Sequence, residues 1–303
     1  MSIWQATKRS KSGSPLVMSC LNKDNNHTQS SRTGRRDLFA PACVVMCLVS
    51  VLYVGSAILA VLIGGAANFT SAISDPEVLF SLRMSLVTAT ISTVLCLLLA
   101  LPSAYALTHT QMPGKRIASV VLELTLSLPY ILLGFALLLI FSSGFGQALK
   151  NAGIAVVFQP LGIVVAQLMV NLPFAIRMIR TAFLTCDPRM EFVAESLGAS
   201  KWEVFRTVIL PLNKNAIVSA FILTWARGMG EFGATLMLVG VTRMRTETIS
   251  GSIYLSIQTG NNEVALATAI VMLLVSACAL ALSNVLSGGI GESRNSLSSK
   301  GAR

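Results

Sequence analysis

The sequence predicts an all-α, polytopic membrane protein, with about six transmembrane helices and a hydrophilic helical hairpin on one side of the bundle. Hydrophobic residues make up 53% of the 303 residues, whereas only 12% are charged. That charged share is about half of what a soluble domain carries. Several apolar runs also reach the roughly 20 residues that an α-helix needs to cross the hydrocarbon layer. They lack the period-two alternation of a transmembrane β-barrel.

Six apolar runs qualify as spans and divide the chain into successive parts. Residues 1–37 are rich in Ser, Asn, Lys and Arg, and are expected to form a disordered tail. Residues 38–78 hold the first span and a loop, residues 79–286 form the transmembrane core, and residues 287–303 form a second tail. The six predicted spans are Ala40–Gly64, Leu79–Leu107, Ile117–Phe141, Leu161–Ile179, Ala216–Val239 and Val264–Leu286.

Three prolines, Pro102, Pro129 and Pro173, lie inside or near these spans. Neighbouring helices can satisfy the backbone groups that a proline frees, so tolerated kinks are expected. A second interpretation is that the kinked helices line a pathway and shift during gating. In the loop 242–262, isoleucines recur every fourth residue at 249, 253 and 257, which predicts a short helix at the outer interface.

The distribution of the 23 Lys and Arg residues predicts the topology. One set of loops holds only Lys150, Arg243 and Arg245, and the spans hold Arg83 and Arg227. The other basic residues lie on the opposite side with both termini, counting Arg177 at the inner end of the fourth span with them. Under the positive-inside rule, both termini are therefore cytoplasmic in a multi-pass protein of the cell membrane. The net charge of +10 is then a topological signal, and nucleic-acid binding is not expected.

The residues of catalytic and metal sites are missing from the sequence. His27 and His109 are the only histidines, and they are too far apart in the chain for a metal pair. The sequence contains neither a Ser/His/Asp arrangement nor a G-x-x-x-x-G-K-[ST] loop for ATP. The chain is therefore predicted to be no enzyme, with no cofactor or metal of its own.

The hydrophilic segment from Asp187 to Pro211 carries ordered helix signals. Asp187 precedes Pro188 as an N-cap, and Gly198 can end that helix in the left-handed conformation. Ser200 and Glu203 then form an S-x-x-E capping box for a second short helix, expected to end at Leu210-Pro211. Trp202, Phe205 and Val208 place bulky apolar groups on this polar segment. Such groups favour a protein partner, although an amphipathic interfacial hairpin fits almost as well.

The same segment resembles the permease signature of ATP-binding-cassette importers, E-A-A, three residues, G, nine residues, I-x-L-P. Here Ala194, Gly198, Leu210 and Pro211 match, and Val208 replaces the isoleucine. Phe192 and Val193 depart from the glutamate and the first alanine, so Glu191 or Glu195 is expected to supply the acidic contact. The resemblance implies that a separate ATPase docks on Glu191, Phe192, Val193, Ala194, Glu195, Gly198, Ala199, Ser200, Val208, Leu210 and Pro211.

The run from Trp225 to Met237 indicates which group of these permeases the chain resembles. It contains R-x-x-G-E-F-G-A-T and is similar to the fifth span of molybdate permeases. Sulfate permeases tend to have Tyr-Gly-Ser in place of Phe232-Gly233-Ala234. The implied cargo is molybdate or tungstate, with a sulfate or thiosulfate permease as the alternative.

Arg227 and Glu231 lie four residues apart in this run, so both would fall on one helix face. Ionisable side chains at membrane depth are candidates for function. Two interpretations stay open, namely an anion pathway and an internal ion pair that fixes helix packing.

The resemblance further implies an importer of the type I architecture. The chain would form a homodimer in the lipid bilayer, with ATP-Mg bound by two cytoplasmic ATPase subunits. An extracytoplasmic oxyanion-binding protein would deliver the cargo. Two other classes remain, an ion-coupled secondary oxyanion transporter and a non-transporting assembly factor.

Overall fold

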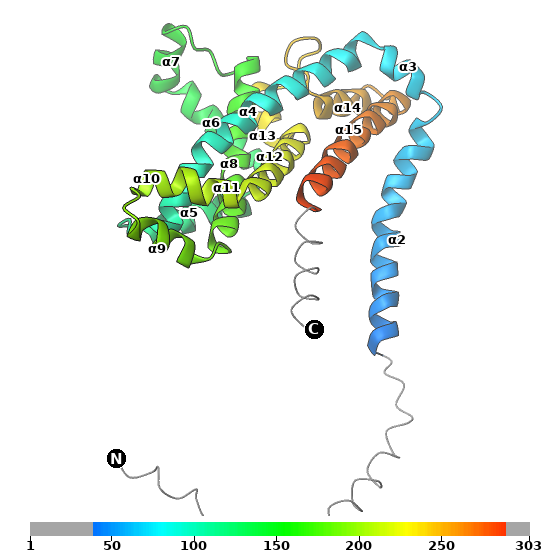
Figure 1. Ribbon diagram of the computed structural model, residues 1–303. Helices are drawn as coiled ribbons and strands as arrows, with labels where there is room; N and C mark the ends of the chain where they lie inside the picture. Colours follow the sequence, from blue (N-terminus) through cyan, green and yellow to red (C-terminus); the bar gives the residue numbers. More distant parts are fainter. Residues whose placement is uncertain (1–38, 289–303) are drawn as a thin grey trace, which may run out of the picture. The chain divides into compact units, whose positions relative to one another are not determined.

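A computed structural model describes residues 39–288, and every regular element within that range is a helix. The predicted tail at 1–37 and residues 289–303 lie outside the described range. Figure 1 labels the helices along the chain. They are α2 (Phe39–Gly65), α3 (Phe69–Ser74), α4 (Pro76–His109), α5 (Lys115–Ser127), α6 (Tyr130–Ser142), α7 (Gly144–Asn151), α8 (Pro160–Leu184), α9 (Pro188–Ser196), α10 (Lys201–Val204), the π-helix η2 (Phe205–Ile209), α11 (Leu210–Leu212), α12 (Lys214–Met229), α13 (Gly233–Val239), α14 (Ile249–Gln258) and α15 (Asn262–Gly288).

Four helices are long and apolar enough to span a membrane, namely α2, α4, α8 and α15. The count rises to six if two bent pairs are each taken as one span, α5 with α6 and the 201–212 segment with α12. The all-helical membrane fold predicted from the sequence is therefore confirmed. Residues 39–58 of α2 belong to a compact unit separate from the rest and form a continuous apolar helix.

Helices α4 and α8 form the centre of the second unit, residues 59–303. Small buried side chains recur every fourth residue along α4, at Cys96, Ala100 and Ala104. Small residues let two helix backbones approach closely in a membrane bundle. Pro102 and Pro173 lie inside α4 and α8, and both helices continue through them.

The third predicted span is broken. The run Ile117–Phe141 divides at Leu128 and Pro129 into α5 and α6, whose axes differ by 113°. Leu128 is extended (φ −78°, ψ 142°), which is the conformation that a following proline favours. The expectation of a kinked but continuous helix is therefore wrong at Pro129.

The fifth predicted span, Ala216–Val239, is broken as well. Helix α12 ends at Met229, and α13 begins at Gly233. The Glu231 carboxylate accepts a hydrogen bond of 2.7 Å from the backbone N–H of Ala234 in the first turn of α13. This side chain thus satisfies a free N–H at the start of a new helix. The hydropathy of the run could not reveal the break.

The helix predicted in the loop 242–262 is present as α14. The Thr248 hydroxyl caps it by accepting from the Gly251 N–H at 3.2 Å. Ile249 is fully buried, whereas Ile257 is exposed, so the isoleucine stripe is covered at only one end.

Close packing of α6 on α13 gives a stability prediction at Gly134. A β-carbon added there would collide with the backbone of Ala234. Gly134→Ala is expected to destabilise the protein by about 1–3 kcal/mol, the usual cost of overpacking. Gly144→Ala is the matched control, because a β-carbon at Gly144 meets no atom within 4 Å. Thermal unfolding in detergent checks this, and equal midpoints for the two variants would contradict it.

Candidate functional site

The hydrophilic hairpin, residues 187–212, has the local structure that its sequence predicts. Asp187 caps α9 through a 2.9 Å hydrogen bond from the Arg189 N–H. At the other end Gly198 has φ +91°. The N–H groups of Gly198 and Ala199 bond to the oxygens of Glu195 (3.0 Å) and Ala194 (3.1 Å), the Schellman pattern of a helix end.

The predicted capping box of the second helix is also present. The Ser200 N–H donates to the Glu203 carboxylate at 2.7 Å, and the Glu203 N–H donates to the Ser200 hydroxyl at 3.4 Å. The bond from the Ser200 N–H to the carboxylate, and then the Ser200 hydroxyl beside it, lower the pKa of the Glu203 carboxyl. Because the pKa of Glu203 is lower in the folded than in the unfolded chain, the cap gives its full stabilisation above the ordinary pKa of glutamate. It weakens as the pH falls through the lowered value.

The second helix does not end at Leu210-Pro211 as predicted. It continues through the π-helix η2 and α11 to Leu212, and the axis then bends by 73° before α12. The Leu210 N–H bonds to the Phe205 oxygen, five residues back. A π-turn widens the backbone just before Pro211, whose ring would otherwise collide with the carbonyl four residues earlier.

Large apolar side chains of the hairpin face solvent. The exposed fraction is 83% for Leu197, 72% for Phe192 and 66% for Trp202, and Met190 and Val193 are more than half exposed. Met190, Val193 and Leu197 share one face of α9 by their spacing. Burying a side chain of this kind is worth about 1.5–3 kcal/mol. This exposed apolar group (Met190, Phe192, Val193, Leu197 and Trp202) is therefore suited to a protein partner.

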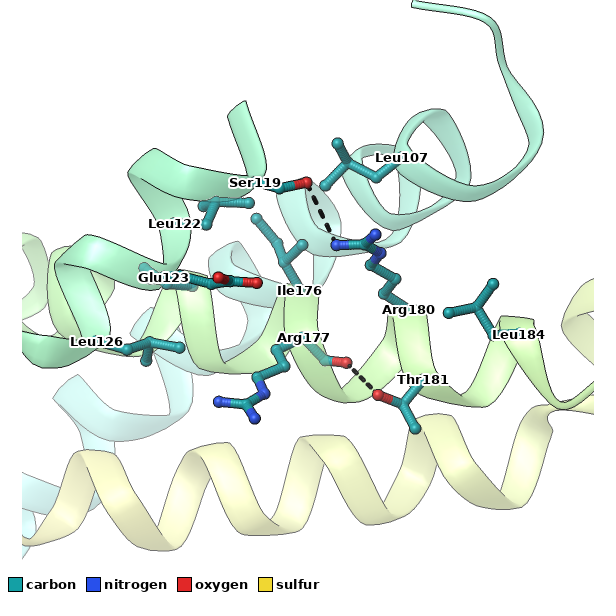
Figure 2. A pocket seen from close by; sticks show the side chains of 11 residues that line it. Leu107, Ser119, Leu122, Glu123, Leu126, Ile176, Arg177, Arg180, Thr181 and Leu184 are labelled. Atoms are coloured by element: carbon teal, nitrogen blue, oxygen red, sulfur yellow. Dashed lines mark hydrogen bonds between the residues drawn. The ribbon is translucent and has the colours of Figure 1, made fainter. Parts of the chain in front are cut away.

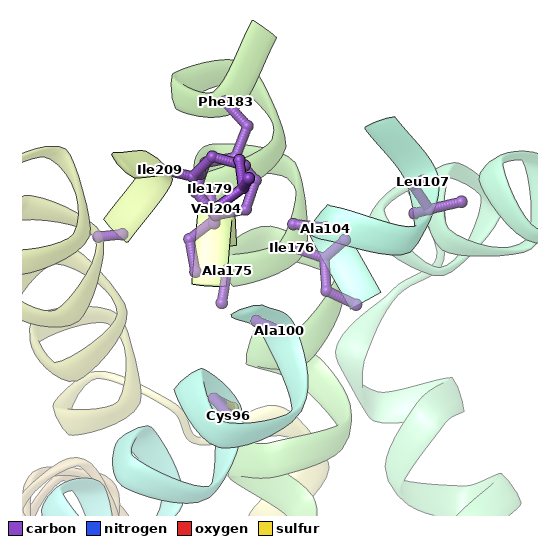
Figure 3. Packing of buried hydrophobic residues seen from close by; sticks show 11 residues of the cluster. Cys96, Ala100, Ala104, Leu107, Ala175, Ile176, Ile179, Phe183, Val204 and Ile209 are labelled. Carbon is purple, nitrogen blue, oxygen red and sulfur yellow. The ribbon is translucent and has the colours of Figure 1, made fainter. Parts of the chain in front are cut away.

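The opposite side of the hairpin is anchored to the bundle. Val204 and Ile209 are buried and belong to one core cluster with Ile179 and Phe183 of α8. Figure 3 shows these side chains together. Ala194, Ala199, Phe205 and Val208 pack against the same cluster. The hairpin is therefore joined to α4 and α8 by close packing as well as by the chain itself. The complete cluster is Cys96, Ala100, Ala104, Leu107, Ala175, Ile176, Ile179, Phe183, Val204, Ile209 and Ala220.

A polar contact adds to this anchor. Nε2 of His109, at the end of α4, lies 2.9 Å from the Glu191 carboxylate of α9. Nδ1 of the same ring lies 2.5 Å from the Thr108 hydroxyl, and the ring stacks on Tyr105. Both side chains of the pair are mostly buried, at 17% and 20% exposed. Glu191 is therefore turned inward, and of the two acidic candidates Glu195 is the exposed one.

The His109–Glu191 contact is testable by a double-mutant cycle. We expect His109→Gln and Glu191→Gln each to lower the uptake obtained per ATP hydrolysed. Because the residues touch, their interaction energy should be about 0.5–3 kcal/mol, so the double variant is little worse than either single one. Glu77→Gln is the matched control for charge, because Glu77 forms an exposed ion pair with Arg243 at the start of α4, the end of that helix away from His109. Strictly additive losses of coupled uptake would show that the two side chains act independently, so that their contact has no role in coupling.

Arg227 and Glu231 do not form the predicted i,i+4 contact, because α12 ends between them. The Arg227 guanidinium lies over the rings of Phe174 (4.8 Å) and Tyr130 (5.3 Å) and donates to the Tyr130 hydroxyl. Glu231 is buried and accepts from Ala234 instead. Each of the two side chains has its own hydrogen-bond partner, and no ion pair joins them.

Sequence reasoning missed a polar seam in the interior of the bundle. Gln167 of α8 is buried and donates to the Gly228 oxygen of α12 at 3.0 Å. Asn171, one turn further, is fully buried beside Gly228. Polar residues four positions apart in an otherwise apolar span are the sequence signal that could have revealed this seam. Between residues 39 and 288, no cluster of three or more His, Cys, Asp or Glu is placed to hold a metal ion.

Known proteins resemble this chain in sequence and in fold. Residues 106–291 match the family model described as binding-protein-dependent transport system inner membrane component. The chain is 29% identical to the sulfate transport system permease protein CysT of Escherichia coli over 249 residues, 82% of this chain and 90% of that protein. It is 35% identical to the molybdenum transport system permease protein ModB of Escherichia coli over 222 residues, 67% of this chain and 93% of that protein.

Solved structures agree on the fold. A bacterial alginate ABC transporter, crystallised in complex with an alginate pentasaccharide-bound periplasmic protein, contains a chain that superposes with a TM-score of 0.70 at 16% identity. The match covers 84% of this chain and 95% of that chain. The bundle therefore shares the fold of that transporter chain.

Proposed function

The chain belongs to the family of binding-protein-dependent transport system inner membrane components, and from that membership we propose that it is the permease subunit for import of molybdate or tungstate. The run from Gly230 to Thr235 and the 35% identity to a molybdenum permease support this cargo. Sulfate is the second candidate, supported by the longer match to a sulfate permease.

We propose that the hairpin 187–212 is the docking site of the ATPase. The observation that carries this is a doubly capped hairpin with an apolar group exposed on one side and a buried anchor on the other. A partner covering Phe192, Leu197 and Trp202 would move the hairpin. Val204 and Ile209 would then move α4 and α8 with it, because packed cores shift as units.

The remaining partners follow from this assignment. An importer of this family works with a separate ATPase and a substrate-binding protein. The chain would act as a homodimer, its termini and hairpin in the cytoplasm, as the distribution of Lys and Arg supports. ATP-Mg would bind to the partner ATPase, and this chain would catalyse no bond change.

Uptake in proteoliposomes that contain the permease, its ATPase and its binding protein tests the proposal. Labelled molybdate should accumulate only with hydrolysable ATP, and tungstate should compete nearly as well as molybdate, since both are tetrahedral dianions. Sulfate competing equally would favour the sulfate alternative. Uptake that continues with an inactive ATPase would reject the ABC mechanism and favour ion-coupled transport.

A further inference from the structure

A basic cavity lies between α5 and α8, at the end of the bundle nearest the hairpin. Its volume is about 180 Å³. Arg177 and Arg180 of α8 form one wall, and Ser119 and Glu123 of α5 form the other. Figure 2 shows Arg180 reaching toward Ser119 across the cavity. A water molecule's share of liquid volume is about 30 Å³, so the cavity admits a phosphate-sized group.

The two guanidinium groups have donors to spare. Arg180 donates one bond, from Nη1 to the Ser119 hydroxyl at 3.3 Å. The Arg177 guanidinium makes no hydrogen bond or ion pair with any other residue between 39 and 288. Glu123 lines the cavity but lies beyond ion-pair distance of both arginines. Two positive charges and one negative charge leave the cavity with a net attraction for an anion.

The depth of the cavity suits a lipid headgroup. Helix α8 has 25 residues, so at about 1.5 Å per residue it is longer than the roughly 30 Å hydrocarbon layer. Arg177 and Arg180 lie in the last two turns before Leu184. Basic cavities between helices at this level are suited to anionic headgroups.

An apolar cavity of about 390 Å³ adjoins the basic one. The two share Leu107, Leu122 and Ile176 in their walls, and Val121 lines only the apolar one. A free oxyanion would use the basic cavity alone. A phospholipid would use both, because its charged phosphate is joined to a hydrocarbon chain.

We propose that the two cavities form one binding site for an anionic phospholipid. Arg177 and Arg180, with Ser119, bind the phosphate, and the apolar cavity takes the start of an acyl chain. Arg180 lies about one helical turn before Leu184, where α8 ends and the connection to α9 begins, so a bound lipid would hold this end of α8 beside the hairpin. This inference goes beyond the transport function and does not depend on the identity of the cargo.

Binding of phosphatidylglycerol to the purified full-length chain in detergent tests the site, with phosphatidylcholine for comparison and native mass spectrometry as readout. Arg177→Gln and Arg180→Gln should each raise the Kd for phosphatidylglycerol about tenfold, the factor expected for a lost charge-assisted hydrogen bond. Arg83→Gln is the matched control, because this exposed arginine lies near the opposite end of α4. Equal effects of all three substitutions would overturn the proposal.

Further variants separate the headgroup from the chain. Glu123→Gln should tighten binding of phosphatidylglycerol, because it removes the opposing charge, and weaker binding would contradict the assignment. Val121→Trp should weaken binding by filling the apolar cavity without changing any charge. Inorganic phosphate or molybdate binding as tightly as the lipid, or phosphatidylcholine binding equally well, would also overturn the proposal. These binding measurements do not depend on molybdate uptake, so the lipid site and the proposed cargo are tested separately.

Discussion

Replacing Gly198 with valine is expected to uncouple transport from ATP hydrolysis while the chain still enters the membrane. Gly198 has φ +91°, and a β-carbon there would meet no atom within 4 Å. The substitution therefore adds backbone strain and no steric clash. A side-chain-bearing residue in the left-handed region costs about 1–2 kcal/mol. That cost disfavours the present turn about tenfold, and coupled uptake should fall by at least about that factor.

The control for this experiment is Gly153→Val. Gly153 has φ +86° and also meets no atom within 4 Å, but it lies in the loop before α8, away from the hairpin. It imposes similar strain without touching the proposed docking site. Uptake, ATP hydrolysis and the amount of permease in the membrane should be measured for both variants. If Gly198→Val transports as well as Gly153→Val, the hairpin turn has no role in coupling.

The caps of the hairpin helices could be predicted because they depend on neighbours in sequence, whereas the end of the second helix at Leu212 was not. Asp187, Gly198 and the pair Ser200–Glu203 each act on backbone groups within five residues. Chemistry over so short a distance can be read directly from the residue order. Hydropathy located α4, α8 and α15 for a similar reason, since every span must cross the same hydrocarbon layer. Each helix nevertheless runs beyond its predicted apolar run, as α8 does from Ile179 to Leu184.

The breaks in the third and fifth predicted spans could not be predicted, because the hydropathy of a run does not depend on the direction of the helix axis. The chain remains apolar through the break between α5 and α6, and Glu231 is the one charged residue in the break between α12 and α13. At Phe232 and Gly233 the new helix starts on a side-chain cap from Glu231, a residue whose charge suggested an ion pair instead. A buried carboxylate can satisfy either a guanidinium or a free N–H. Only the three-dimensional arrangement decides between them.

The contacts that anchor the hairpin to the bundle could not be predicted from the sequence either. His109 and Glu191 are 82 residues apart in the chain, and nothing in either local sequence links them. Phe205 and Val208 were expected among the exposed apolar groups, but they pack on the core cluster, whereas Leu197 is the most exposed. The amphipathic character was evident from the sequence. Which face met the bundle depended on where α8 ended.

Replacing Arg227 with alanine is expected to reduce stability and transport together. The guanidinium joins α12 to the rings of Tyr130 and Phe174 and to the Tyr130 hydroxyl. A desolvated cation–π contact is worth about 2 kcal/mol, and a hydrogen bond to a charged group about 1.5–3 kcal/mol. Loss of both should destabilise the protein by several kcal/mol and loosen the break between α5 and α6.

Two further variants make this test decisive. Arg227→Lys keeps the positive charge but loses the planar group that stacks between the rings, so a packing role predicts that it is nearly as harmful as alanine. An anion pathway predicts that lysine restores much of the uptake, because the charge remains. Tyr130→Phe, which removes only the hydroxyl, should give a smaller loss of thermal stability. Normal stability with lost uptake in Arg227→Ala would show that this arginine acts on the cargo rather than on the fold.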